Sequence, residues 1–363
     1  MKPRPPHQLF PRLHEWIHTH RTRTYAFVGL GLVVSAALVA ATVYYQSPVA
    51  TVDTTPIKVA NKPKPAPVYY SPLTGLKVDS EAATKQLVTA IMIENSPDAR
   101  PQSGLKDAGI VYEAIAEGGI TRFLTLHQED KPQLIGPVRS LRMYYLDWAA
   151  PYNASIAHIG GSAAALGEVR NGNYRDIDQF FNAAYYWRAS DRYAPHNVYT
   201  SFEKLDALNA KKGYTSSSFT GFSRTDGKAS TVPNATSIDM NFSSTWYNTH
   251  YDYDPATNTY LRSIGGAPSE DREKGRLTPS VVVALKVDMH TILEDGYRQS
   301  IQTTGTGTAY VFQNGTVTEC TWRKNDRMSP LELLDASGKT ILLNRGQTWV
   351  GAIPNSGGSV SWT

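Results

Sequence analysis

Charged and hydrogen-bonding side chains gather in five short segments of this sequence, each where an apolar run ends or a turn begins. In sheets covered by helices, ligands bind where strands end and loops begin. Because an unpaired charge at the edge of a core is costly, five such segments predict one shared polar cleft. The residues are Glu94, Asn95 and Arg100; Glu113, Glu117 and Arg122; Arg139 and Arg142; His158; and Arg192, His196 and Asn197.

The arginines indicate a binding site for an anionic or polyhydroxylated ligand. The planar guanidinium group of an arginine matches the geometry of carboxylate and phosphate groups. We therefore expect Arg122, Arg139, Arg142 and Arg192 to hold such a ligand, with cell-wall glycan as the candidate. The remaining binding residues of this hypothesis are Asn95, Arg100, Glu113, His158, His196 and Asn197.

A second hypothesis is an enzyme that cleaves cell-wall glycan. Glycoside hydrolysis needs a carboxylic acid with a raised pKa, often beside a second carboxylate. Glu117 and Glu94 are the candidate catalytic residues, and Glu113 is a further carboxylate. Glu113 and Glu117 are four residues apart, so in a strand they would face the same side. A third interpretation stays open, in which the arginines and glutamates pair with one another as a buried structural network.

Other chemistries have little support in the sequence. The serines and histidines are not accompanied by a nucleophile-elbow motif. The histidines of the folded part do not share zinc-ligand spacing, so we expect neither a metal nor a cofactor. The only cysteine, Cys320, lies in the alternating run GTVTECTW and is interpreted as a buried strand residue.

The segment PHNVYTS, from Pro195 to Ser201, is predicted to form one wall of the cleft. Proline fixes its own φ angle and restricts the residue before it, and Ser201 is expected to cap the helix that follows. Extended backbone between these two points would send alternate side chains to opposite faces. We therefore expect His196 to lie near Arg192 and one of the glutamates, and Val198 to anchor the segment in the core.

An apolar stretch near the N-terminus predicts a membrane anchor. Residues 25–45 contain no charged residue, and about 20 apolar residues are needed to cross a bilayer. Arg21 and Arg23 precede the stretch, so the positive-inside rule places residues 1–24 in the cytoplasm and the folded part outside the cell membrane. A cleaved signal peptide is the alternative, although its apolar region would be unusually long.

The charge distribution argues against nucleic-acid binding. The formal net charge is +4, and residues 1–24 supply all of it, since they hold five basic residues and one acidic residue. The rest of the chain is neutral, so the folded part lacks a basic footprint. The sequence does not indicate a protein partner.

The elements that must position these residues follow a proline-rich linker over 46–72. Region 73–226 mixes apolar runs such as QLVTAIMI with helical patterns, including one over 201–213. This mixture predicts an α/β domain with a mixed sheet and helices. Region 227–363 contains mainly strand patterns, including a hairpin around Asn314–Gly315, and predicts a β-rich C-terminal domain.

Both regions also resemble a known family. The segments IENSPDARPQSGL, IVYEAIAEGGITRF, IGPVRS and PHNVYTS, with GTGTAYVFQNG, CTW and GQTWVGAIP nearer the C-terminus, are similar to the YerB-like family of bacterial envelope proteins. The resemblance runs from Tyr70 to Pro354. It implies an extracytoplasmic two-domain lipoprotein with a domain of unknown function, and it implies no activity. This sequence departs from the lipoprotein pattern because no cysteine lies near the apolar stretch, so we expect that stretch to be the anchor.

Overall fold

The computed structural model describes residues 21–46, 67–292 and 298–363. The chain divides into two units, Met1–Pro65 and Ala66–Thr363. Most of the predicted cytoplasmic tail and of the predicted linker lies outside the described residues.

In the first unit, the apolar stretch forms helix α2 (Arg21–Gln46). Its part from Tyr25 to Gln46 is long and apolar enough to cross a membrane. The predicted apolar helix is therefore present, and its crossing of a membrane stays a prediction.

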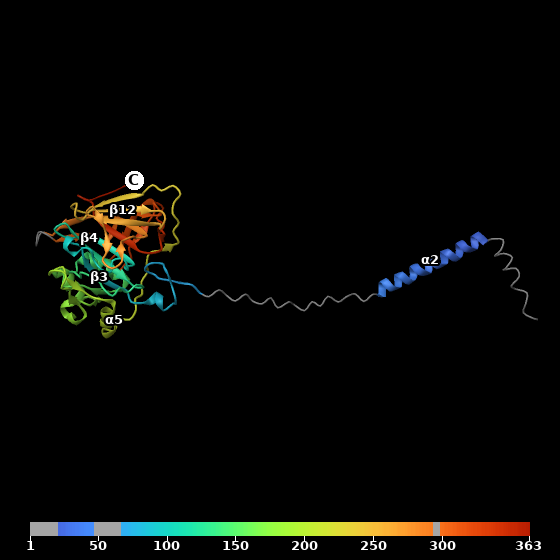
Figure 1. Cartoon of the computed structure of the whole chain (residues 1–363), viewed down its shortest axis with the longest axis horizontal. Coiled ribbons are helices and arrows are strands. Elements are labelled where there is room, and N and C mark those ends of the chain that lie inside the picture. Colours follow the sequence, from blue (N-terminus) through green and yellow to red (C-terminus); the bar gives the residue numbers. More distant parts are fainter. Residues whose placement is uncertain (1–20, 47–66, 293–297) are drawn as a thin grey trace, which may run out of the picture. The chain divides into compact units, whose positions relative to one another are not determined.

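The second unit is built on a ten-stranded mixed sheet (Figure 1). Near the C-terminal end of the chain, strand β24 pairs in parallel with β17 on one side and with β4 on the other. The order across the sheet is β22 (Glu332–Leu334), β21 (Thr316–Lys324), β20 (Gly305–Gln313), β17 (Val281–Val287), β24 (Thr348–Pro354), β4 (Ile110–Glu117), β5 (Ile120–His127), β3 (Thr89–Glu94), β6 (Ser155–Ala157) and β7 (Arg175–Asp176). The predicted mixed α/β fold with a strand-rich C-terminal region is thereby confirmed.

A second sheet has five strands, all from the C-terminal region. Its order is β14 (Ala267–Pro268), β13 (Thr259–Ile264), β12 (Thr249–Asp254), β11 (Ser237–Asn241) and β25 (Ser359–Trp362). The small two-stranded sheets are β1 (Tyr69–Tyr70) with β2 (Lys77–Val78), β8 (Trp187–Arg188) with β9 (Val198–Tyr199), β10 (Arg224–Thr225) with β23 (Leu343–Asn344), β15 (Glu270–Asp271) with β16 (Gly275–Arg276), and β18 (Met289–Thr291) with β19 (Gln299–Ile301).

The predicted domain boundary at residue 227 falls in the segment between β10 and β11. Strands from both sides of this position join the ten-stranded sheet, with β4 before it and β24 after it as direct neighbours. The division into two domains stays a prediction for limited proteolysis.

Two apolar cores lie on the two faces of the ten-stranded sheet, because side chains alternate along each strand. In β4, Tyr112 faces one core and Val111 faces the other. On the first face, Trp148 of α3 stacks on Tyr112 with 5.4 Å between the ring centroids. The helices are α3 (Met143–Ala149) and α4 (Ala163–Asn171), which pack on the first core, and α5 (Phe202–Lys211), which packs on the second core together with the five-stranded sheet.

Several local signals in the sequence are confirmed. The Ser201 hydroxyl caps α5 by accepting a hydrogen bond from the backbone N–H three residues later, at 3.3 Å. Gly213 follows the last turn of α5 with a φ of 77°. Asn314 and Gly315 have φ angles of 60° and 74° and form the tight turn between β20 and β21.

His127, at the end of β5, is fully buried. Its Nε2 lies 3.1 Å from the Thr125 hydroxyl oxygen, and its ring lies 5.4 Å from the ring of Phe202. Burial lowers the pKa of His127 to about 3, so the imidazole is neutral in the folded protein.

We expect acid to destabilise the fold through His127. In the unfolded chain the pKa is about 6.5, so below that pH the unfolded chain binds a proton that the folded chain excludes. The contribution of neutral His127 is therefore lost as the pH falls from about 6.5 toward 3, and the loss reaches about 2 kcal/mol at pH 5. Chemical denaturation at pH 7.5 and pH 5 should show a smaller loss for His127→Gln than for the wild type.

The matched control is His290→Gln, because His290 is exposed. This variant should keep the wild-type loss between the two pH values. An equal loss in His127→Gln and the wild type would contradict the assignment.

Candidate functional site

The carboxylate of Glu113 is fully buried on the central strand β4. One oxygen accepts hydrogen bonds from Arg262 Nη2 at 2.8 Å and from Trp349 Nε1 at 3.0 Å. The other accepts from Thr121 Oγ1 at 3.0 Å and from Asn95 Nδ2 at 3.3 Å. For Glu113 this geometry favours the structural-network interpretation over ligand binding, because both oxygens are used inside the protein.

The partner of Glu113 comes from the other sheet. Arg262 lies on β13, is buried, and places its guanidinium carbon 4.4 Å from the ring centroid of Trp349. Burial acts to lower the pKa of Arg262, but the combined interactions with the Glu113 carboxylate and Tyr251 outweigh it and raise the pKa. Arg262 therefore stays charged, and its bond to Glu113 ties the five-stranded sheet to the ten-stranded sheet.

We expect Glu113→Gln to lower the free energy of unfolding by about 3–5 kcal/mol, because it leaves the Arg262 charge buried without a counter-charge. Combining Glu113→Leu with Arg262→Met should recover part of this loss, since no charge is then left buried. The recovery is incomplete because Trp349, Thr121 and Asn95 lose their acceptor. Urea denaturation monitored by tryptophan fluorescence measures both changes.

The control is Glu332→Gln, which breaks the partly exposed pair with Arg323. It should change the free energy of unfolding by less than about 1 kcal/mol. A double variant as unstable as Glu113→Gln would show that the pair contributes more than charge balance.

Asn95 and Arg100 extend the Glu113 network toward the surface. Arg100 donates from Nε to Asn95 Oδ1 at 3.1 Å and from Nη2 to the Asn95 carbonyl at 2.9 Å. The same Nη2 donates to the carbonyl of Trp246 at 3.0 Å. Arg100 therefore fastens the end of β3 to the loop between β11 and β12.

Glu117 lies between two arginines. Its carboxylate accepts hydrogen bonds from Arg122 Nη2 at 2.8 Å and from Arg142 Nη2 at 2.8 Å. Burial acts to raise the pKa of Glu117, but the attraction of both guanidinium groups outweighs it and lowers the pKa. Glu117 is therefore a carboxylate at neutral pH.

The expectation that Glu113 and Glu117 face the same side is wrong. A β-bulge between Ile115 and Glu117 shifts the register of β4 against β5. Glu113 consequently bonds Thr121 and Glu117 bonds Arg122, and these neighbours on β5 point to opposite faces. The extra residue separates the two carboxylates.

The Glu94 carboxylate contacts polar side chains from three segments of the chain. Its Oε1 lies 2.9 Å from His196 Nδ1, 3.2 Å from Arg139 Nε and 3.0 Å from Ser96 Oγ. The expected placement of His196 near a glutamate is confirmed, and Val198 is buried in the second core as expected.

The other candidate residues lie in separate environments. His158 is fully buried, with Nδ1 2.8 Å from the Gly160 carbonyl and Nε2 3.1 Å from Asp176 Oδ1. Arg192 donates to the carbonyls of Asp98 and Pro101, at 3.2 and 2.6 Å. Asn197 accepts from Arg188 Nη1 at 2.8 Å and donates to the Ala189 and Arg192 carbonyls. The structure uses each of these side chains to hold loops in place.

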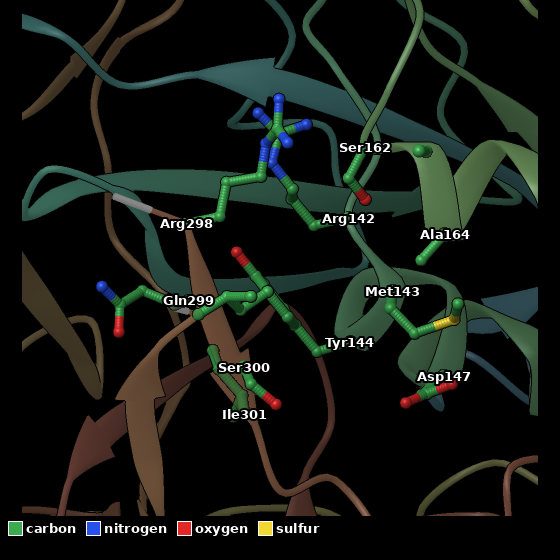
Figure 2. A pocket seen from close by; sticks show the side chains of 12 residues that line it. Arg142, Met143, Tyr144, Asp147, Ser162, Ala164, Arg298, Gln299, Ser300 and Ile301 are labelled. Carbon is green, nitrogen blue, oxygen red and sulfur yellow. The ribbon is translucent and has the colours of Figure 1, made fainter. Parts of the chain in front are cut away.

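A cavity of about 500 Å³ lies beside the Glu117 cluster. Figure 2 shows Arg142 and Arg298 projecting toward the same part of it. Ser162, which caps α4, and the first residues of that helix form another part of the lining. The lining residues are Arg142, Met143, Tyr144, Asp147, Ser162, Ala163, Ala164, Ile292, Arg298, Gln299, Ser300 and Ile301.

Of the residues chosen from the sequence, Arg142 lines this cavity. Glu117 forms an ion pair with Arg142 and another with Arg122, so both residues are connected to the lining through Arg142. The sequence reasoning missed Ser162 and Arg298. Serine before the helical run AAALGEV was a readable capping signal for Ser162. Arg298 gave no local signal, because the fold of β18 and β19 onto α3 brings it to the cavity.

The comparisons with known proteins define the class. Two family models match, described as the N-terminal domain and the C-terminal domain of a protein of unknown function (DUF3048), over residues 73–215 and 238–350. The chain belongs to this family.

A particular relative can also be named. The chain is 32% identical over 298 residues to the "Putative lipoprotein YerB" of Bacillus subtilis (strain 168), covering 81% of this chain and 88% of the relative. The crystal structure of YerB protein from Bacillus subtilis matches with a TM-score of 0.72 at 29% identity, covering 81% of this chain and 99% of that one. The resemblance to the YerB-like family is thereby confirmed.

Proposed function

We propose that this chain is a membrane-anchored extracytoplasmic protein that binds an anionic group of a cell-envelope glycan in the cavity beside Arg142. The observation that carries the proposal is the convergence of Arg142, Arg298 and the N-terminus of α4 on one cavity. Guanidinium groups bind carboxylates and phosphates, and the N-terminus of a helix favours negative charge.

The charge balance of the Glu117 cluster supports an anionic ligand. Arg122 and Arg142 share a single carboxylate, that of Glu117, so this cluster keeps one positive charge. Asp147 also lines the cavity, but its carboxylate accepts hydrogen bonds from Arg327 Nε at 2.6 Å and Thr303 Oγ1 at 2.7 Å.

The alternative of a glycan-cleaving enzyme has weaker support. A general acid must hold its proton at working pH, which requires a raised pKa. The pKa of Glu117 is lowered by its two arginines. Glu94, the other candidate, is engaged by Arg139 and His196. The geometry therefore favours binding over hydrolysis.

We expect Arg142→Gln and Arg298→Gln each to weaken binding to purified cell-wall sacculi by about tenfold or more. The reason is the loss of a charge-assisted hydrogen bond, worth about 1.5–3 kcal/mol. Co-sedimentation of the full chain in lipid nanodiscs measures the affinity. Sacculi with blocked carboxylates, and sacculi stripped of phosphate polymers, identify the anion.

Arg323→Gln is the matched control, since Arg323 forms a surface pair away from the cavity lining. It should leave binding unchanged. Two cavity variants that fold normally and bind as the wild type does would overturn the proposal. Release of soluble wall fragments by the wild type, abolished in Glu117→Gln, would favour the enzyme instead.

The proposed anchor is α2 itself. The one cysteine, Cys320, is buried in β21 as expected, so its thiol is not exposed for attachment of a lipid. Residues 1–24 hold the excess positive charge, which favours a cytoplasmic N-terminus. The lipoprotein description of the Bacillus subtilis relative supports an envelope location by a different kind of anchor.

We expect protease added to intact protoplasts to remove residues 66–363 and to leave a protected fragment that contains the N-terminus. Immunoblotting with tags at each end measures this. A C-terminal tag that stays protected until the membrane is permeabilised would show the opposite orientation.

A further inference from the structure

A tryptophan on the five-stranded sheet is exposed to solvent. Trp246 lies in the loop that joins β11 to β12, and 63% of it is exposed. Burying a large aromatic side chain is strongly favourable, so one that the fold leaves exposed at a hollowed surface points to a ligand.

The loop that carries Trp246 is held in one conformation. The Trp246 carbonyl accepts a hydrogen bond from Arg100, which is itself fixed to Asn95. The next residue, Tyr247, is buried under the Arg100 guanidinium, with 5.3 Å from the guanidinium carbon to the ring centroid. Asn248 Oδ1 accepts from the Phe242 N–H at 3.1 Å and closes the loop. A ligand would therefore meet a preorganised backbone and lose little affinity to ordering it.

Trp246 lines two hollows. The larger, of about 440 Å³, also contains Asp239, Asn248 and His250. The smaller, of about 250 Å³, contains Arg100 and Glu270. Trp246 and Gly265 belong to both linings, so the two hollows adjoin, as subsites do when successive units of a chain bind side by side.

Polar side chains continue from the larger hollow across the outer face of the sheet. Ser361, Asp239, His250 and Ser263 lie opposite one another on β25, β11, β12 and β13, and opposite residues share a face. His250 is fixed by two carboxylates, with Nδ1 2.8 Å from Asp239 and Nε2 3.0 Å from Asp252. This row offers hydroxyl and carboxylate groups beside Trp246, and the imidazole of His250 holds the carboxylates in fixed positions.

We propose that this surface binds a neutral glycan chain, with the indole of Trp246 stacked on one sugar ring and with Asp239 and Asn248 bonding its hydroxyls, while His250 holds Asp239 in place. A sugar ring has an apolar C–H face and polar edges, and an aromatic face with a negative quadrupole complements the C–H groups. Asp239 in the row and the neighbouring Asp252 place two carboxylates against one imidazole, which disfavours an acidic polymer. The site is thus distinct in ligand and position from the cavity beside Arg142 and does not depend on it.

A protein partner would need a different surface. Interface hot spots are aromatic residues surrounded by well-packed, water-excluding contacts, usually in an apolar centre. The row beside Trp246 is polar throughout, and Asp239 and Asp252 are more than half exposed. These observations favour the glycan.

The test uses the full chain in lipid nanodiscs, with isothermal titration calorimetry. The probes are chitohexaose and cellohexaose, which are neutral, and oligogalacturonate, which is acidic. We expect at least one neutral oligomer to bind, and we expect Trp246→Ala to weaken that binding by tenfold or more. Trp246→Tyr should retain part of it. Tyr193→Ala is the matched control, because Tyr193 is an exposed aromatic residue that lines neither hollow.

Arg142→Gln should leave neutral-oligomer binding intact, so failure of this proposal is distinguishable from failure of the proposed function. Binding by neither neutral oligomer would overturn the inference. So would equal affinity of Trp246→Ala and the wild type, or tighter binding of the acidic oligomer at this surface. Self-association in sedimentation velocity that disappears in Trp246→Ala, without glycan binding, would assign the surface to a protein contact instead.

Discussion

The buried ion pair between Glu113 and Arg262 is the constraint on which the rest of this structure depends. A charge cannot be left alone in a core, so the strand that carries Glu113 and the strand that carries Arg262 must meet. Their meeting fixes how the two sheets pack, and Trp349 is held between them by its bond to Glu113 and its contact with Arg262. Asn95 and Arg100 extend the same network outward to the Trp246 loop. The buried charges of Glu113 and Arg262 are therefore linked by hydrogen bonds to the loop that carries Trp246 at the surface.

Most charged groups near the core form ion pairs with one another. A functional site is therefore expected at charged groups that face a cavity. The carboxylates of Glu94, Glu113 and Glu117 each form an ion pair with an arginine, so none has the surroundings of a general acid. The cavity beside Arg142 differs from these internal pairs, because Arg142 and Arg298 line it together with the N-terminus of α4. The hollow beside Trp246 is instead lined by the carboxylate of Asp239.

Local chemistry made part of this architecture predictable from the sequence. The Ser201 cap and the Asn314–Gly315 turn depend on short-range rules, and the structure follows them. Family membership was also readable from motifs. The bulge between Ile115 and Glu117 could not be predicted from the sequence. One extra residue hardly changes the alternating apolar pattern of the strand, yet it turns the Glu117 side chain to the opposite face of the sheet. The order of the strands in the sheet could not be predicted either. The pairing of β24 with β4 depends on tertiary packing, and no local sequence pattern indicates it. Arg298 reaches the cavity for the same non-local reason.

The central place of β24 also governs when the fold can form. Trp349 on β24 and Glu113 on β4 are 236 residues apart in the sequence, yet β24 fills the gap between β17 and β4. Until that strand arrives, the sheet has two unpaired inner edges, and such edges invite aggregation. A chain that emerges N-terminus first therefore cannot close the ten-stranded sheet until β24 has emerged. Pairing over such a distance is slow. Synthesis of this protein thus passes through a stage in which every other strand of the ten-stranded sheet is already present in the chain while β24 is still missing.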